Sequence, residues 1–229
     1  MRRQLVLLPI LFGFFVMGFA DIISTALIRI EEECRLSAFA AAVLPLMIFV
    51  WFLLISIPTG ILCGKIGRKN TVLASLALTV AAMFLPFAAT AERWWIYAVS
   101  FAFLGIGNTM IQAALPALMS NVVPQEKLTA RISLGQFVKA LCAAATPVVA
   151  LFCAERLGNW KYLFLVYGAL TFVAAAWLAL SPIPREKAAA VPPSFASCVR
   201  QLASPYILAM VVGVFFSVAA DIGFAVGVP

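Results

Sequence analysis

The stretch GFFVMGFADI at residues 13–22 is repeated as GVFFSVAADI at residues 213–222, and both copies end in an aspartate followed by isoleucine. Asp21 of the first copy therefore corresponds to Asp221 of the second. A carboxylate inside an apolar membrane helix is costly and usually has a function. A repeated helix that carries the same carboxylate predicts a two-halved transporter whose substrate binds between the repeats. The alternative is a chance match between two apolar segments, although an aspartate is the residue least expected to match in that way.

The composition is that of a membrane protein. Hydrophobic residues make up 65% of the chain and charged residues 11%, and the mean hydropathy is +1.09. A soluble domain would carry about a quarter charged residues. The apolar run near the N-terminus continues past Asp21 to about Ile28 without a small-residue cleavage site. We therefore predict an all-α membrane protein with a retained first helix rather than a cleaved signal peptide.

Several kinds of chemistry are disfavoured by the residues that the chain lacks. It contains no histidine, and its five cysteines are scattered without a CxxC pair. Histidine-based triads and HExxH metal sites are therefore excluded, and disulfides or a zinc site are not expected. The chain also has no GxSxG sequence and no paired carboxylates at catalytic spacing. We expect a protein that is not an enzyme and that binds neither a metal nor a cofactor.

Apolar stretches long enough to span a membrane divide the chain. A spanning helix needs about 20 mostly apolar residues. Seven stretches meet this length, at roughly 5–29, 37–62, 71–91, 94–120, 131–154, 161–180 and 205–228. The segment between the last two is longer, polar and rich in proline. The expected domains are an N-terminal six-transmembrane-helix bundle at 1–180, a cytoplasmic linker at 181–204, and the first helix of an incomplete C-terminal bundle at 205–229.

The orientation follows from the Lys and Arg residues in the short loops, which concentrate on the cytoplasmic side of membrane proteins. Ten of them fall on the side of the N-terminus and five on the other side. The N-terminus is therefore expected to be cytoplasmic, in a multi-pass protein of the inner or plasma membrane. The net charge of +7 is explained by this topology and by contact with lipid headgroups, and no nucleic-acid partner is expected.

The loop between the second and third apolar stretches reads GILCGKIGRKN at residues 60–70. It resembles the loop motif of the major facilitator superfamily, G-x-x-x-D-(R/K)-x-G-x-(R/K)-(R/K), at the place where that family carries it. The residues that match or flank the motif are Gly60, Lys65, Gly67, Arg68 and Lys69, and we assign them to a gating loop. Gly64 occupies the position of the family's aspartate, so the charge network that this aspartate supports in the family lacks its carboxylate here. Independently of the family, glycines permit a tight turn and cations meet anionic headgroups.

Two further segments are similar to the fucose-permease-like branch of sugar:proton symporters. They are MGFADI in the first stretch and LGIGNTMIQAALPALMSNVVPQEKLTARISLGQFVKA, beginning at Leu104. The resemblance implies a major facilitator fold and a role for Asp21 in proton coupling. Asn108 stands where some members carry a second carboxylate. Members have twelve helices, and this chain matches the N-terminal six and the seventh.

Polar residues within the fourth and fifth stretches predict a site for a hydroxylated solute. Asn108 and Gln112 lie one turn apart, as do Gln136 and Lys139, so the four could form one cluster. Amide side chains donate and accept hydrogen bonds and so suit a sugar, although the same residues also serve as contacts between helices. Lys139 needs a partner or an aqueous cavity, and Asp21 is a candidate, but counting residues from the ends of the expected helices separates their depths by about 12 Å.

These observations predict secondary active transport of a small polar solute, with a sugar as the expected solute, by proton-coupled alternating access. The alternatives are a truncated or split half-transporter that needs a missing C-terminal half or a homo-oligomer, and a non-transporting membrane binding or scaffold protein. The solute's identity and the choice between protons and sodium are left open by the sequence.

Overall fold

The computed structural model describes residues 2–183, 195–201, 203–213 and 216. The elements in chain order are α1 (Arg2–Met17), η1 (Gly18–Asp21), α2 (Ile22–Cys34), α3 (Ala38–Ile66), α4 (Arg68–Phe84), η2 (Leu85–Ala88), η3 (Ala91–Arg93), α5 (Trp95–Ser120), α6 (Gln125–Arg156), α7 (Tyr162–Leu180) and α8 (Phe195–Gln201). Residues 205–213 are also helical. All regular structure in the described part of the chain is thus helical, which confirms the predicted class.

Six of these helical segments are long and apolar enough to cross a membrane. They are Val6–Cys34, Phe39–Ile66, Arg68–Ala88, Trp95–Ser120, Gln125–Arg156 and Tyr162–Leu180. They correspond to the first six stretches predicted from the sequence. The predicted seventh span lies largely outside the described residues, as does Asp221.

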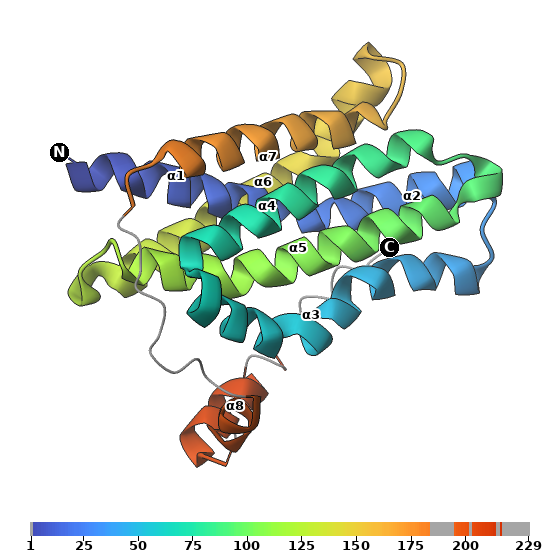
Figure 1. Ribbon diagram of the computed structural model, residues 1–229. Coiled ribbons are helices and arrows are strands. Elements are labelled where there is room, and N and C mark those ends of the chain that lie inside the picture. The colour runs from blue at the N-terminus through green and yellow to red at the C-terminus, as the bar shows by residue number, and fades with distance from the viewer. Residues whose placement is uncertain (1, 184–194, 202, 214–215, 217–229) are drawn as a thin grey trace.

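The long helices form one bundle in which α5 is central (Figure 1). α5 packs along both α3 and α4, α4 also packs on α7, and α1 lies against α5, α6 and α7. Glycines allow the closest of these approaches. A Cβ at Gly105 would lie 2.5 Å from the carbonyl oxygen of Ile48 on α3, and one at Gly107 would lie 2.6 Å from Oγ1 of Thr79 on α4. Small residues at contacts are the main means by which helices associate tightly in lipid.

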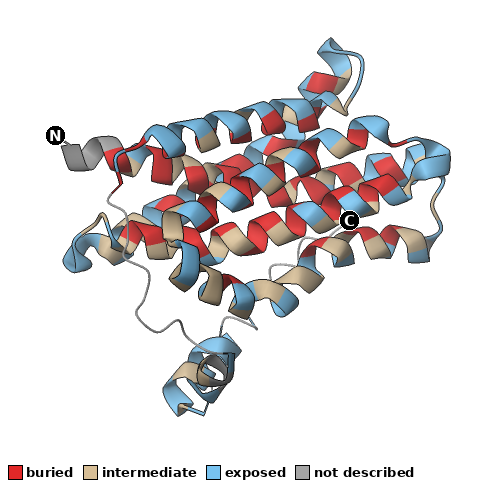
Figure 2. Cartoon of the chain, viewed as in Figure 1, coloured by how far each residue is buried: buried red, intermediate tan, exposed pale blue. Residues whose placement is uncertain are grey.

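The six spans are buried to very different extents within the bundle (Figure 2). The most apolar window of the first span is 67% buried and that of α5 is 61% buried, whereas those of α3 and α6 are 17% and 22% buried. The first span and α5 therefore form the interior. α3 and α6 present most of their apolar surface to the outside of the described bundle.

Candidate functional site

The first span tightens into a 3-10 turn near its middle, at the place where its carboxylate stands. The 3-10 turn η1 separates α1 from α2 and ends at Asp21. Gly18 is buried in this turn, and Asp21 is half-buried. A Cβ at Gly18 would lie 2.7 Å from the carbonyl oxygen of Lys139 and 2.8 Å from Cβ of Cys142. The absence of a side chain at Gly18 is therefore what allows η1 to lie directly against α6.

The contact between the first span and α6 runs along two matching stripes. Phe14, Gly18 and Asp21 follow one another at helical spacing, as do Gly135, Lys139 and Cys142. A Cβ at Gly135 would lie 2.7 Å from the ring of Phe14. Phe14 thus packs on Gly135 and Gly18 packs on Lys139 and Cys142 of α6, with Asp21 one turn further along the first span.

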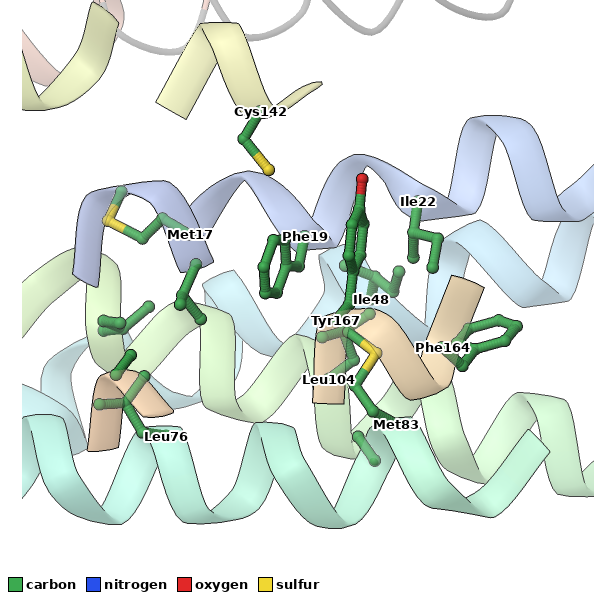
Figure 3. Packing of buried hydrophobic residues seen from close by; sticks show 14 of the residues in the cluster. Met17, Phe19, Ile22, Ile48, Leu76, Met83, Leu104, Cys142, Phe164 and Tyr167 are labelled. Atoms are coloured by element: carbon green, nitrogen blue, oxygen red, sulfur yellow. The ribbon is translucent and has the colours of Figure 1, made fainter. Parts of the chain in front are cut away.

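Three buried residues surround this part of the first span on the side of α6 and α7. We call Cys142, Thr146 and Tyr167 the thiol–hydroxyl cluster. The Thr146 and Tyr167 hydroxyl oxygens are 2.8 Å apart, and the Thr146 hydroxyl also donates to the Cys142 carbonyl oxygen at 3.1 Å. The Tyr167 ring stacks on Phe19 of η1, with ring centroids 4.0 Å apart. Figure 3 shows Cys142 pointing toward the first span and the Tyr167 ring beside Phe19.

Sequence reasoning missed this cluster. In the sequence Cys142 is one of five scattered cysteines, and single Thr and Tyr residues are common in apolar helices. The available signal was a helical spacing, since on α6 Cys142 lies one turn beyond Lys139 and Thr146 lies one turn beyond Cys142.

Lys139 lies at the level of Gly18, which corrects the depth expected from the sequence. Its carbonyl is the atom nearest to a Cβ at Gly18, and its side chain is half-buried. The predicted difference of about 12 Å from Asp21 was too large because α6 begins at Gln125 rather than near residue 131, whereas α1 begins only three residues before its predicted start. The net change raises Lys139 relative to Asp21 by three residues, or about 4.5 Å.

The other predicted solute-binding residues differ in exposure. Asn108 is buried, Gln112 is half-buried and Gln136 is exposed. The first two lie on α5, whereas Gln136 lies on α6 beside Lys139. The hydrogen bonds of the described chain do not join any two of these four side chains. Their joint action on a solute stays a prediction.

The predicted gating loop is short, and Arg68 and Lys69 within it contact neighbouring helices. α3 ends at Ile66 and α4 starts at Arg68, with only Gly67 between them at a φ of 86°. This positive φ suits glycine. The Arg68 guanidinium donates to the Ala117 carbonyl at 2.7 Å, to Ser120 Oγ at 2.9 Å and to Asn121 Oδ1 at 2.6 Å. Arg68 thus caps the C-terminus of α5, where carbonyl groups lack helical partners.

Lys69 does the same for α7. Its amine donates to the carbonyl oxygens of Ala179 and Ser181, both at 2.9 Å. Lys65 is exposed, and no atom lies within 4 Å of the place that a Cβ at Gly60 would occupy. Arg68 and Lys69 therefore join the start of α4 to the C-terminal ends of α5 and α7.

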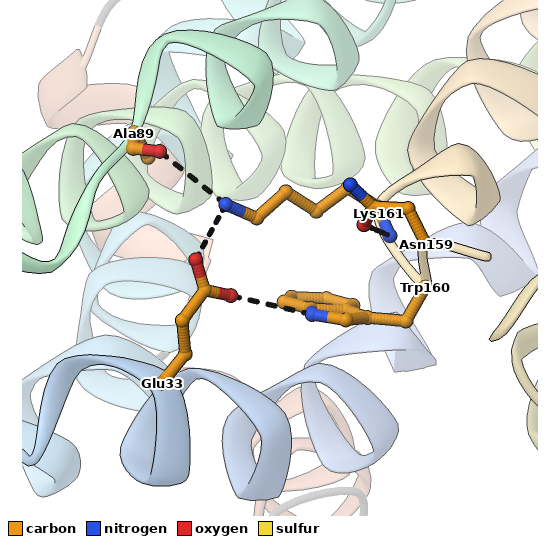
Figure 4. Close-up of polar contacts among 5 residues, drawn as sticks. All are labelled: Glu33, Ala89, Asn159, Trp160 and Lys161. Atoms are coloured by element: carbon orange, nitrogen blue, oxygen red, sulfur yellow. Dashed lines mark hydrogen bonds and ion pairs between the residues drawn. The ribbon is translucent and has the colours of Figure 1, made fainter.

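A second polar group lies at the opposite end of the bundle, where the first span ends (Figure 4). The Lys161 amine is 2.6 Å from Glu33 Oε1 and 3.3 Å from the Ala89 carbonyl. The Trp160 indole donates to Glu33 Oε2 at 3.3 Å, and Lys161 lies 5.6 Å from the centre of the Tyr97 ring. This Glu33–Lys161 cluster ties the ends of several helices together. The sequence did not predict it, because its charged partners are 128 residues apart.

The electrostatics of Lys161 follow from these contacts. Burial of the amine lowers the pKa of Lys161. Its interactions with Glu33 and Tyr97 raise that pKa by more, so the pKa of Lys161 lies above its ordinary value. The side chain of Lys161 is 13% exposed and that of Glu33 is 33% exposed. The pair is thus partly desolvated, which makes it stronger than a fully exposed ion pair.

Among the described residues, no three His, Cys, Asp or Glu side chains are grouped in a way that could hold a metal ion.

Comparisons with known proteins identify the fold and its family. The family model described as Major Facilitator Superfamily matches residues 10–229. A gentisate transporter of Corynebacterium glutamicum is 25% identical over 132 residues, which are 56% of this chain and 29% of the transporter. The crystal structure of the E. coli fucose:proton symporter superimposes with a TM-score of 0.69 at 18% identity, covering 89% of this chain and 56% of the symporter.

The proton:xylose symporter XylE, bound to 6-bromo-6-deoxy-D-glucose, superimposes with a TM-score of 0.64 at 17% identity. That match covers 80% of this chain and 45% of XylE. The chain thus spans about half the length of the two symporter structures and less than a third of the gentisate transporter.

Proposed function

Because this chain belongs to the Major Facilitator Superfamily, we propose that it takes part in secondary active transport of a small polar solute, with a sugar as the favoured solute and protons as the coupling ion. The observation that carries this proposal is Asp21, a half-buried carboxylate at the end of a 3-10 turn within a membrane span. A 3-10 stretch within a longer helix often marks a functional hinge, and an ionisable residue within a membrane span is a functional candidate. The fucose:proton symporter and the proton:xylose symporter, which share this fold, supply the solute class and the coupling ion for the proposal.

In this proposal Asp21 is the proton-coupling residue and Lys139 responds to it. The two belong to the adjacent stripes of the first span and α6, at similar depth. An ionised Asp21 attracts the Lys139 amine, and protonation of Asp21 removes that attraction. Lys139 then becomes available to the solute or to another partner, so that the proton and the solute are coupled through one cation.

Asn108, Gln112 and Gln136 are proposed to bind the solute. Their amide groups both donate and accept hydrogen bonds, as hydroxyl groups of a sugar require. Gln136 is exposed on α6, which presents most of its surface to the outside of the described bundle. A solute on that surface would meet Gln136 and Lys139 on the same helix face.

The domain arrangement is proposed to follow the family. Residues 1–180 form the first bundle, 181–204 a cytoplasmic linker, and 205–229 begin the second bundle with Asp221 as the counterpart of Asp21. A second bundle would cover the outward surfaces of α3 and α6 and complete the cavity. It is supplied either by a C-terminal half or by a second copy of the chain, and the N-terminus is cytoplasmic.

The test is uptake by the purified protein in proteoliposomes under an imposed proton gradient. A panel of labelled hexoses and pentoses is offered with and without a protonophore, and Asp21→Asn is compared with the unchanged protein. Proton-driven uptake that is lost with the protonophore and in Asp21→Asn supports the proposal. Binding without flux favours a non-transporting role, and uptake driven by sodium alone refutes proton coupling.

A second solute class is favoured by the similarity to a gentisate transporter. An aromatic carboxylate would form an ion pair with Lys139, whereas a neutral sugar would only accept hydrogen bonds from its amine. Uptake of gentisate and hexoses is therefore compared in the unchanged protein and in Lys139→Gln. Loss of gentisate uptake in Lys139→Gln, with no hexose uptake in either protein, would establish the organic acid as the solute.

A further inference from the structure

The two halves of the first span are held in the bundle by different contacts. α1 and η1 lie against α5 and α6 through glycines. A Cβ at Gly13 would lie 3.1 Å from both methyl groups of Leu115 on α5, and one at Gly18 would lie 2.7 Å from the Lys139 carbonyl oxygen on α6. α2 contains no glycine and packs on α3 and α6, which are the least buried of the six spans. The second half of the span therefore rests on the least enclosed helices of the described bundle.

The two halves meet at a stretch of weaker backbone hydrogen bonding. η1 is a 3-10 turn between two α-helical segments, and a 3-10 stretch inside a longer helix often marks a hinge. Residues 35–37 connect α2 to α3. Pro45 is the eighth residue of α3, and it cannot donate the backbone hydrogen bond that a helix requires at its position. α2 and the first turns of α3 thus form a hairpin with one weak point in each arm.

Glu33 joins the end of this hairpin to another side of the bundle. Its Oε1 accepts a hydrogen bond from the Lys161 amine at 2.6 Å, and its Oε2 accepts one from the Trp160 indole at 3.3 Å. Both donors stand directly before α7, a helix that packs chiefly on α4 and α1. The carboxylate thus links α2, which rests on α3 and α6, to the α7 side of the bundle.

The partners of Glu33 keep other contacts of their own (Figure 4). The Lys161 amine also donates to the Ala89 carbonyl at 3.3 Å and lies 5.6 Å from the centre of the Tyr97 ring. The Trp160 and Tyr97 rings stack with their centroids 6.4 Å apart. The Glu33 side chain is 33% exposed and the Lys161 side chain 13%, so the carboxylate can pass into water while the amine remains held. The contact can therefore be broken and remade without dismantling the helices on the side of Lys161.

We propose that α2 and the start of α3 form a gate that turns about η1 and Pro45, and that the Glu33–Lys161 cluster is the latch that holds this gate closed. In the closed position the inner face of α2, with Ala26 and Ile30, is fully buried. Opening exposes that face and gives water a route toward η1 from the end of the bundle opposite the predicted gating loop. The movement lies within the first bundle, so the inference requires neither the proposed solute nor the proposed coupling ion.

The test measures whether the buried face of α2 becomes accessible when the latch is broken. Ala26→Cys and Ile30→Cys each place a thiol on that face, and Val16→Cys places one on α1, where Val16 is also buried. The full chain in lipid nanodiscs is treated with a trimethylammonium methanethiosulfonate reagent, which carries a fixed charge and stays in water. Mass spectrometry of the peptide that contains the new cysteine gives its rate of modification. Cys34, which is half-buried and follows Glu33, reports on the last turn of α2.

The latch is broken by Glu33→Gln and, separately, by Lys161→Met. The matched control is Glu32→Gln, which removes the neighbouring carboxylate from an exposed position. Each latch variant is expected to raise the modification rate at Ala26→Cys about tenfold, because modification requires the gate to open and one hydrogen bond to a charged group no longer opposes that opening. Glu32→Gln should leave the rate unchanged. Size-exclusion chromatography and thermal unfolding confirm that each variant is folded.

The outcomes separate a gate from simpler effects. A faster reaction at Cys34 with no change at Ala26→Cys or Ile30→Cys means that only the last turn of α2 frays, and it overturns the inference. An equal increase at Val16→Cys, or in Glu32→Gln, overturns it as well, because the loosening is then not confined to α2 or not due to the latch. Increases confined to α2 support the gate. If they occur in a protein that shows no uptake in proteoliposomes, the gate is supported and the proposed transport is rejected.

Discussion

Replacing Gly18 by alanine tests whether the close contact between η1 and α6 holds the site together. The added Cβ would lie 2.7 Å from the Lys139 carbonyl oxygen and 2.8 Å from Cβ of Cys142. Carbon atoms prefer contacts of about 3.5–4.0 Å, so the two elements must separate by roughly an ångström. Both nearby atoms belong to backbone or to the base of a side chain, so a rotamer change cannot relieve the contact. Overpacking of this kind costs about 1–3 kcal/mol.

The matched control is Gly60→Ala. No atom lies within 4 Å of the new Cβ at Gly60, and replacing glycine by alanine inside a helix is worth roughly 0.5–1 kcal/mol. The two variants thus make the same chemical change with opposite expected effects. Thermal unfolding in detergent should show Gly18→Ala below the unchanged protein and Gly60→Ala at or above it.

Transport should separate the two variants more strongly. Moving Asp21 by about an ångström relative to α6 is expected to reduce uptake at least tenfold, because displacements of this size in a reacting geometry are costly. Gly60→Ala should retain uptake. Equal thermal stability of the two variants, with uptake in Gly18→Ala within twofold of the unchanged protein, would refute the argument that this contact positions Asp21.

Three further outcomes are expected. Asp21→Asn should abolish accumulation against a gradient while preserving solute exchange, measured as counterflow, because exchange requires no net proton movement; accumulation in this variant would contradict the coupling role. Arg68→Gln should lower thermal stability by about 1–2 kcal/mol through loss of the cap on α5, and Lys65→Gln, at an exposed position, should not; equal effects would argue against the cap. Lys161→Met should cost about 1 kcal/mol at neutral pH. Since the pKa of Lys161 is raised on folding, its contribution is complete below its ordinary value of 10.5 and is lost as pH rises through the higher folded value, so melting curves of the two proteins should converge only above that pH.

The fold could be predicted from the sequence because membrane spans are defined by length and hydrophobicity. The ends of the helices were less predictable. α6 continues to Gln125 through polar residues, whereas hydropathy marks only the apolar part of a helix. Pro124 stands at its N-terminal cap, and this proline was the better indicator of where the helix starts.

The candidate site was predictable only in part. Asp21 and Lys139 could be found because charged residues are rare in apolar stretches. Tyr167 and Thr146 could not, since each is ordinary in its own helix and they become a pair only when α6 packs on α7. The Glu33–Lys161 pair has the same origin. Contacts between distant segments depend on packing, which a single sequence does not display.

The capping of α5 and α7 by Arg68 and Lys69 has a consequence for how the protein is made. Arg68 precedes its acceptor Ala117 by 49 residues, and Lys69 precedes Ala179 by 110 residues. During synthesis both cations therefore emerge before the carbonyl groups that they bind in the folded bundle. In that interval they can act as orientation signals for the newly inserted helical hairpin. Once α5 and α7 have been inserted, the same side chains donate hydrogen bonds to the C-terminal ends of those helices, so that one loop serves first to orient the hairpin and then to join the helices of the bundle.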